Sequence, residues 1–338
     1  MKEFLSSAGF KVGSDIFFIT DKDYNFCKYS TEKNQISYQN EFSFDVSGKN
    51  NPDMFIYGEK YIYAPSLNGK YLIVINVKTF DICSYSINAN GDSWGNYAFI
   101  YFFKGKLYIF CKKIPKLIIF DEEENLIVEK DFPYEVSHGN ANNNDVWLLS
   151  SDGKRIISYN LKNAQISVCE LSRKLNQIVC SEIEETNIFL LSYTGTVYMF
   201  DTVEKRIKIL IEPSFNMKVG RMIISKKRII ILPDLGDDIF FIDKNNGRID
   251  KYSDYPADFK YIGNEGWSKF HGCCKLDDMI YYFPRSSNYI LCVNLNLEDI
   301  MWLRPKLPSK KEMMNYYMSK NGILSEEMFS INDFMEYI

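Results

Sequence analysis

The most constraining feature of this chain is a spacing that recurs seven times. In each copy an apolar run ends in a polar residue, and an isoleucine stands six positions later without any gap. The polar residues are Ser30, Asn76, Asp121, Asn160, Asp201, Asp243 and Asn294, and the isoleucines are Ile36, Ile82, Ile127, Ile166, Ile207, Ile249 and Ile300. Because about one residue in nine of the chain is isoleucine, seven matches in seven indicate a structural repeat.

Each copy has the pattern of a β-hairpin. The residues one and three positions before the polar residue are apolar or aromatic, as are Tyr198 and Phe200 before Asp201. This alternation predicts a strand with one apolar face. Asp and Asn suit the end of such a strand because the short side chain accepts a hydrogen bond from the backbone about two residues on. The isoleucine then opens the return strand.

Two further strands are expected before each hairpin. Apolar runs such as "NIFLLS" and "RIIILPD" precede it, and several of the intervening turns carry glycine, as in Asn68-Gly69 and Asp152-Gly153. Most repeats begin with one more apolar segment, whereas the fourth repeat has "SHGNANNN" there and is the exception. Four antiparallel strands recurring every 39 to 51 residues match the blade of a β-propeller.

We therefore predict an all-β fold in which residues 1–304 form a seven-bladed β-propeller of four-stranded antiparallel blades. The alternative is a ring of six blades with one repeat rearranged. An isolated blade would expose both faces of its sheet, whereas a ring buries each face on a neighbour and shortens the exposed edges. Stability is therefore expected to be collective.

The hairpin of "IDKNNGRI" (242–249) and its copies resemble those of the β-propeller repeat superfamily, in particular kelch-like and PQQ- or YVTN-type blades. The resemblance covers about 300 residues and implies the fold. The double glycine of kelch repeats, the Trp-Asp pair of WD40 repeats and the tryptophan docking of PQQ enzymes do not recur, and Trp302 stands in such a place only in the last blade. No function carries over from these families.

Charge and composition limit the classes of partner. The formal net charge is -4, which gives no broad positive field, so nucleic acid is not an expected partner. No window approaches the ~18 unbroken apolar residues of a membrane span, and the first residues lack the apolar core of a signal peptide. The eight cysteines stand mostly in apolar strands and behave as small buried hydrophobes. We expect a cytoplasmic protein.

The pattern changes after residue 304. Ser309 and Glu312 have the spacing of a capping box, and Gly322 is a plausible helix stop. A second helix is expected from about Ser325 to Ile338. We predict that this C-terminal helical extension, residues 305–338, packs on the propeller and covers an edge or a mouth of the ring. The alternative is a docking segment for a partner.

Propeller ligands usually bind where the innermost strands and the loops between blades meet the central axis. Counting back eight residues from the start of the second strand places His138, Arg221 and His271 at matching positions of blades four, six and seven. The two histidines are the only ones in the chain, and each precedes a glycine. We expect them to face each other across the axis with Arg221 between them.

Two aromatic segments add to this candidate site. Trp94 and Asn96 in "GDSWGN" and Trp267 in "NEGWSKFHG" precede innermost strands. Aromatic platforms near a mouth suit a sugar or a planar ligand. The ligand-binding candidates are therefore Trp94, Asn96, His138, Arg221, Trp267 and His271.

No metal or cofactor is expected. His271, Cys273 and Cys274 in "HGCC" lack the two-residue spacer with which paired thiolates hold zinc, and strand alternation sends adjacent cysteines to opposite faces. The segment "DKDYNF" imitates a calcium loop, but Phe26 stands where the loop needs glycine. Glycine-rich phosphate loops that open a helix are absent from the sequence pattern, and no local motif marks a catalytic nucleophile.

The favoured function is a non-catalytic scaffold that binds a protein or peptide partner on one face of the ring, because a rigid ring presents many loops at little ordering cost. The alternative is a propeller that binds a glycan or small polar ligand, or a lyase or hydrolase, acting through His138, His271 and Arg221. A scaffold should have an exposed apolar patch. A ligand-binding or catalytic site should have convergent polar groups with shifted pKa values.

Overall fold

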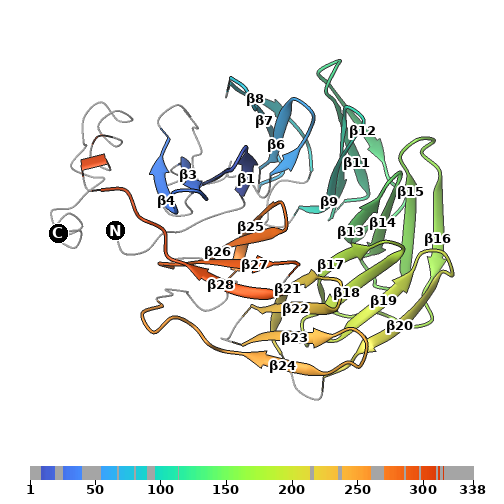
Figure 1. Ribbon diagram of the computed structural model, residues 1–338. Helices are drawn as coiled ribbons and strands as arrows, with labels where there is room; N and C mark the ends of the chain where they lie inside the picture. The colour runs from blue at the N-terminus through green and yellow to red at the C-terminus, as the bar shows by residue number, and fades with distance from the viewer. Residues whose placement is uncertain are drawn as a thin grey trace.

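The chain folds into a ring of seven four-stranded antiparallel sheets, as the computed structural model in Figure 1 shows. The structure describes residues 9–19, 26–39, 55–66, 68–79, 81–89, 96–112, 114–213, 217–234, 238–259, 270–284, 287–296, 298–309, 311–312 and 315. Each sheet is built from four consecutive strands, so blade follows blade in chain order. The seven-bladed propeller is confirmed, and the six-bladed alternative was wrong.

The four strands of a blade run from the ring axis outward (Figure 1). The innermost strands are β1 (Gly9–Val12), β5 (Ile56–Tyr57), β9 (Tyr97–Phe103), β13 (Val136–Asn142), β17 (Ile178–Glu184), β21 (Val219–Ile224) and β25 (Phe270–Leu276). The second strands are β2 (Asp15–Ile19), β6 (Tyr61–Pro65), β10 (Lys106–Cys111), β14 (Asp145–Ser150), β18 (Asn187–Ser192), β22 (Arg228–Pro233) and β26 (Met279–Pro284).

The outer half of each blade is the hairpin that the sequence predicted. The third strands are β3 (Phe26–Ser30), β7 (Tyr71–Asn76), β11 (Lys116–Asp121), β15 (Arg155–Asn160), β19 (Val197–Asp201), β23 (Ile239–Asp243) and β27 (Ile290–Asn294). The outermost strands are β4 (Gln35–Tyr38), β8 (Ile82–Ser86), β12 (Leu126–Asp131), β16 (Ile166–Glu170), β20 (Arg206–Ile211), β24 (Ile249–Tyr252) and β28 (Asp299–Leu303).

The register of the hairpins confirms the repeat. In all seven blades the apolar residue before the polar anchor is the Cα partner of the isoleucine six positions after it. In six blades the anchor's side-chain oxygen also accepts a hydrogen bond from the backbone two residues on. Asp201 illustrates this, since its Oδ1 accepts from the amides of Val203 and Glu204 at 2.8 and 2.9 Å. The six-residue spacing therefore reflects a turn that is stabilised by hydrogen bonds from its backbone to the side chain of the anchor residue.

The core of the molecule lies between the blades. Seven buried apolar clusters are found in the described part of the chain, one at each boundary between neighbouring blades. The boundary between the last blade and the first is filled in the same way: the rings of Phe18 and Phe283 stack with centroids 4.8 Å apart. Burying one such side chain stabilises by about 1.5–3 kcal/mol, so the ring is held by all seven boundaries together.

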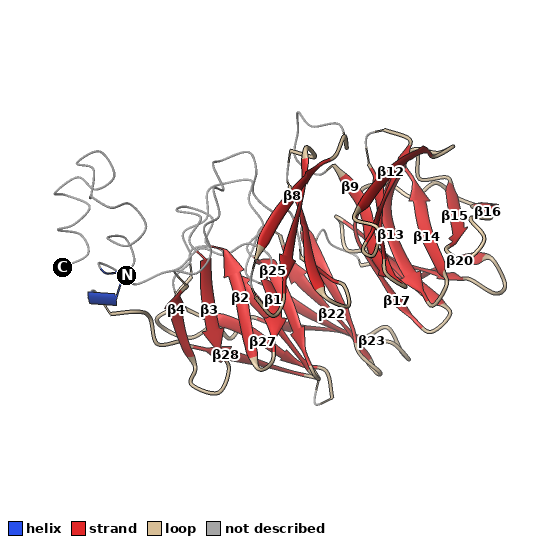
Figure 2. Ribbon diagram, turned by 90° about the horizontal axis from the view of Figure 1, so that it is seen from above, coloured by secondary structure: helices blue, strands red, loops and turns tan. Residues whose placement is uncertain are grey.

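The chain then crosses from blade seven back to blade one. Beyond β28, the backbone of Lys306 pairs in parallel with the outermost strand of blade one. The Ile36 amide donates to the Lys306 carbonyl and the Lys306 amide donates to the Asn34 carbonyl, each at 2.8 Å, and Leu307 packs on the cluster between the two blades. We name residues 304–307 the clasp; Figures 1 and 2 show the chain passing β4 at this point.

The capping box at the start of the extension is present. The Ser309 hydroxyl donates to Glu312 Oε2 at 2.7 Å, and the Glu312 amide donates back to the serine oxygen at 3.2 Å. Helical geometry is assigned to residues 311–312 and 315. Gly322 and the second predicted helix, residues 325–338, lie outside the described residues. In the part of the chain that is described, no helix is long and apolar enough to cross a membrane.

The fourth repeat is not an exception. Its polar segment forms the seven-residue strand β13, in which Gly139 pairs with Leu148 and Asn140 with Trp147. The prediction of a missing strand was wrong because it relied on apolar alternation. An innermost strand lies at the ring axis, where side chains need less apolar contact, and backbone pairing to β14 is enough to define it.

Candidate functional site

A recurring irregularity aligns the innermost strands of blades three to seven. In each of these blades the pairing of the first two strands skips one residue of the inner strand, as in a β-bulge. The skipped residues are Ala98, Ser137, Val179, Gly220 and His271. His138 and Arg221 each follow the bulge of their own blade and are structurally equivalent, as expected.

His271 does not match His138. It is the skipped residue itself, and Gly272 takes the position equivalent to His138. The predicted equivalence of the two histidines was wrong by one residue, because the count began at the first apolar residue of each second strand. Asp145 begins the second strand of blade four and is polar, so the count in that blade began one residue later. Met279 stands at the same place in blade seven and is apolar, so the count began at Met279 itself. Both residues pair with the polar anchor of their own blade. The His271 side chain lies outside the described part of the structure.

His138 is held close to the axis by tight packing behind it. A Cβ atom added to the following Gly139 would lie 2.5 Å from the Cβ of Phe99, so this position accepts only glycine. His138 Nδ1 is buried and has no hydrogen-bond partner among the described residues. Burial, assisted by the charges of Lys112 and Arg221, lowers the pKa of His138 to about 4. At neutral pH the imidazole is therefore uncharged.

Glu182 of blade five is the second titratable group near the axis. It lies two positions after Cys180, the blade-five equivalent of His138. Burial raises the pKa of Glu182 to about 7, although the charges of Arg221 and Lys275 favour the carboxylate. The pKa of Glu182 thus lies close to neutral pH, well above that of an exposed glutamate.

Blade seven contributes a thiol and a phenol. Cys273 pairs with Tyr282 on the neighbouring strand, and Tyr282 is buried. Cys273 is exposed to solvent, yet desolvation raises its pKa. A side chain that is reached by water but surrounded by protein is typical of the lining of a narrow opening. Burial also raises the pKa of Cys180 to about 12 and that of Tyr282 well above its usual value.

Arg221 links these groups. Burial is the largest cause of the pKa shift in each of the five groups described above. The guanidinium charge of Arg221 also affects the pKa of each of them. We name the set the axial cluster: His138, Cys180, Glu182, Arg221, Cys273 and Tyr282. Sequence reasoning found two of the six. Counting back eight residues in blade five would also have found Cys180, because "QIVCS" has the same spacing; nothing local marked the other three.

Asn96 does not join this cluster. Asn96 is fully buried beside the turn of Gly69, where an added Cβ would lie 3.2 Å from the Asn96 amide nitrogen. The Asn96 carbonyl accepts a hydrogen bond from the Lys112 amide at 2.7 Å. These contacts hold in place the residue that precedes β9, the first strand of blade three. Trp94 and Trp267 lie outside the described residues.

Metal-binding chemistry finds no support in the described part of the chain, where no three His, Cys, Asp or Glu side chains are grouped to hold an ion. Cys273 shares a face of the sheet with Tyr282, which packs at the boundary with blade six, whereas Cys274 packs into the boundary with blade one, so the adjacent thiols do point to opposite faces. The calcium-like segment at residues 21–25 lies outside the described residues. None of the eight cysteines forms a disulfide bond among the described residues.

Comparison with known proteins establishes the fold alone. No family model matches the chain, and no curated protein matches it. Among solved structures, a catalytically inactive histidine-to-alanine variant of virginiamycin B lyase from Staphylococcus aureus with quinupristin is similar with a TM-score of 0.64 and 10% identity, covering 86% of this chain and 94% of that chain.

Two further structures belong to proteins of other functions. The dihydro-heme d1 dehydrogenase NirN is similar with a TM-score of 0.54 and 10% identity, covering 89% of this chain and 67% of that chain. PorZ, a surface component of the type-IX secretion system of Porphyromonas gingivalis, has a TM-score of 0.59 and 11% identity, covering 91% of this chain and 38% of that chain. Proteins with this fold thus have unrelated functions.

Proposed function

We propose that the protein binds a small anionic molecule at the axial cluster, with Arg221 as the main charged contact. The observation that carries this proposal is that three cations, Arg221, Lys112 and Lys275, act on the described groups of the axial cluster. The one carboxylate of that cluster is Glu182, whose pKa is raised by burial. A guanidinium among partly desolvated groups is well suited to bind a carboxylate or phosphate.

This proposal corresponds to the alternative function that the sequence suggested rather than to the favoured scaffold. Polar groups with shifted pKa values converge on the axis, as a ligand site requires. The exposed large apolar side chains of the described residues are spread over five of the blades, and no more than two of them lie on any one blade: Tyr57, Tyr71, Leu126, Val128, Val168, Val203 and Met301. A protein-binding scaffold therefore has less support than a small-molecule site.

If the site is catalytic, Glu182 is a better proton acceptor than His138. A general base works best when its pKa lies near the working pH. The pKa of Glu182 is about 7 and that of His138 about 4, so at neutral pH the imidazole can accept a hydrogen bond but holds a proton poorly. A lyase or hydrolase acting here would thus rely on Glu182 to move a proton and on Arg221 to hold the anionic group.

The proposal is tested by calorimetric titration at low salt with citrate, succinate and inorganic phosphate as probes. At least one probe is expected to bind saturably, and R221Q should weaken it at least tenfold, about the effect of losing one charge-assisted contact. R248Q is the matched control, because it removes the same charge from an exposed position of the same blade. Equal loss in both variants, or no saturable binding of any probe to the parent protein, would contradict the proposal.

Anion binding should also depend on pH in one direction. Between pH 6 and pH 8 Glu182, with a pKa of about 7, loses its proton and places a negative charge near Arg221. Affinity is therefore expected to fall by about tenfold over this range, since one negative charge added to an anion site alters binding by on the order of 1–2 kcal/mol. E182Q should flatten the profile.

The stability of E182Q gives a separate check that Glu182 itself, rather than an altered fold, causes the pH dependence of anion binding. Because the folded-state pKa of Glu182 is raised, its ionisation destabilises the protein as pH rises from its ordinary value of 4.5 through about 7. E182Q removes this cost and should have a higher urea midpoint than the parent at pH 8. An unaltered pH profile of anion binding in a folded E182Q protein would exclude Glu182 from the site.

A further inference from the structure

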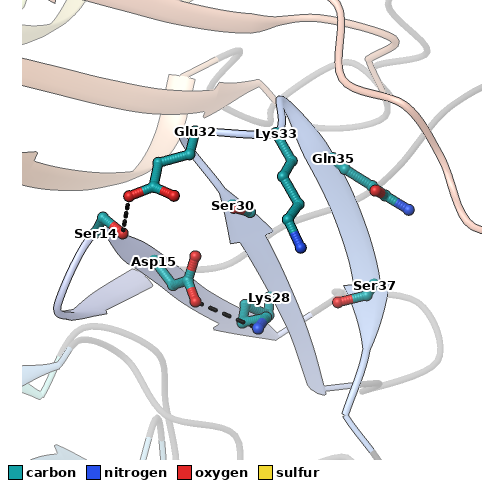
Figure 3. Close-up of a pocket in the computed structure, with 8 residues that line it drawn as sticks. All are labelled: Ser14, Asp15, Lys28, Ser30, Glu32, Lys33, Gln35 and Ser37. Carbon is teal, nitrogen blue, oxygen red and sulfur yellow. Dashed lines mark hydrogen bonds and ion pairs between the residues drawn. The ribbon is translucent and has the colours of Figure 1, made fainter.

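A polar pocket lies on blade one, away from the axial cluster. It has a volume of about 330 Å³ and is formed by the turn between β1 and β2 and by the outer strands β3 and β4 (Figure 3). Its lining residues are all polar or charged: Ser14, Asp15, Lys28, Ser30, Glu32, Lys33, Gln35 and Ser37. This size is in the range of small-molecule sites.

Blade one departs from its sister blades at a position of the third strand that lines this pocket. Lys28 pairs with Phe17, and Phe17 packs against blade two, so both lie on the face turned toward that blade. The equivalent residues of the other blades are Val74, Ile119, Ser158, Met199, Phe241 and Cys292. None of the six is charged, and five of them are apolar. Phe241, for example, fills the boundary between blades six and seven.

The charges around the pocket are balanced and only partly satisfied. Lys28 Nζ lies 3.3 Å from Asp15 Oδ2, and the Ser14 hydroxyl donates to Glu32 Oε1 at 3.3 Å. The ammonium of Lys33 and the side-chain amide of Gln35 have no partner among the described residues. Figure 3 shows Asp15, Lys28 and Lys33 extending into the same space. Two carboxylates and two ammonium groups thus face one small volume.

We propose that this pocket binds a small zwitterion, such as an α-amino acid or a dipeptide. The ligand's ammonium would lie against the carboxylates of Asp15 and Glu32, and its carboxylate would take a hydrogen bond from Lys33. A ligand with a single charge would meet one matched pair and one repelled pair, so balanced lining favours a molecule that carries both charges. The lining has no aromatic ring on which a sugar or a planar base could stack.

The binding test uses calorimetric titration with L-alanyl-L-alanine and L-alanine as zwitterionic probes. Acetate and methylammonium serve as probes that carry one charge each. We expect saturable millimolar binding of at least one zwitterion and at least tenfold weaker binding of both single-charge probes. Saturable binding of acetate as tight as that of the zwitterions, or no zwitterion binding up to about 50 mM, an affinity of less than 2 kcal/mol, overturns the proposal.

Two variants place the binding in this pocket. D15N and K33Q are each expected to weaken zwitterion binding at least fivefold, and both side chains are surface groups whose loss leaves the fold intact. The control is K106Q in blade three, which removes the same charge from a surface lysine outside the pocket, one that pairs with Asp121 at 2.7 Å. R221Q should leave zwitterion binding unchanged, so this site and the axial cluster succeed or fail separately. Equal effects of K33Q and K106Q would contradict the assignment.

Discussion

A chain that ends at Leu303 is expected to melt about 8 °C below the full-length protein, because it lacks the clasp that joins blade seven to blade one. The clasp makes two backbone hydrogen bonds to blade one, and Asn34 Nδ2 donates a third to the Arg304 carbonyl at 2.9 Å. With about 1 kcal/mol for each bond and about 1–2 kcal/mol for the half-buried Leu307, the loss is about 4 kcal/mol. For a domain of this size that corresponds to roughly 2 °C per kcal/mol.

A chain that ends at Ser309 separates the clasp from the extension. It keeps residues 304–307 and removes residues 310–338, which include Glu312 of the capping box. Thermal melts of the full-length protein and the two shorter chains, followed by circular dichroism, give the contribution of each part. We expect the step from Ser309 to Leu303 to be the larger one. Identical melting of the two shorter chains would show that the ring closes without the clasp.

Gly153→Ala is expected to destabilise the protein by about 4 kcal/mol. Gly153 has a φ of 70°, which L-residues other than glycine adopt at a cost of about 1–2 kcal/mol. An added Cβ would also lie 2.1 Å from the carbonyl oxygen of Leu175. That carbonyl belongs to backbone, which cannot move aside cheaply, because the Leu175 amide donates to the Gly153 carbonyl at 2.8 Å. Overpacking of this kind adds about 1–3 kcal/mol.

Gly105→Ala is the matched control for the free-energy cost of placing a residue other than glycine at positive φ. Gly105 has nearly the same φ, 72°, but an added Cβ meets no atom within 4 Å. Urea unfolding should therefore show a loss of about 1 kcal/mol for G105A and a much larger loss for G153A. If the two variants unfold at the same urea concentration, the contact with Leu175 does not contribute to the loss of stability in G153A.

The hairpin repeat could be predicted because its cause is local. An Asp or Asn anchor closes its own turn through a backbone hydrogen bond, and the strand on either side must alternate. Both requirements act within about ten residues, so they leave a fixed spacing in the sequence. The polar strand β13 was missed for the opposite reason. Nothing in "SHGNANNN" alternates, and only β14 beside it provides the hydrogen bonds that make it a strand.

The axial cluster was predictable only in part. His138 and Arg221 could be found because both follow a bulge at the same distance from the next strand. His271 was misplaced because a bulge shifts the strand by one residue, and an apolar Met279 hid that shift. Glu182 and Cys273 carried no local mark. Their importance arises from proximity to Arg221, which depends on how three blades are set around the axis.

The sequence by itself determined the number of blades, the position of every outer hairpin and the pairing of each isoleucine, since these follow from short-range hydrogen bonding and alternation of side chains. Only the tertiary structure decided which polar groups share the ring axis, where the charged Lys28 lines a pocket on blade one, and how residues 304–307 close the ring. Those features join segments up to about 270 positions apart in the chain, and contacts at such separation are fixed by packing of the blades rather than by any local pattern.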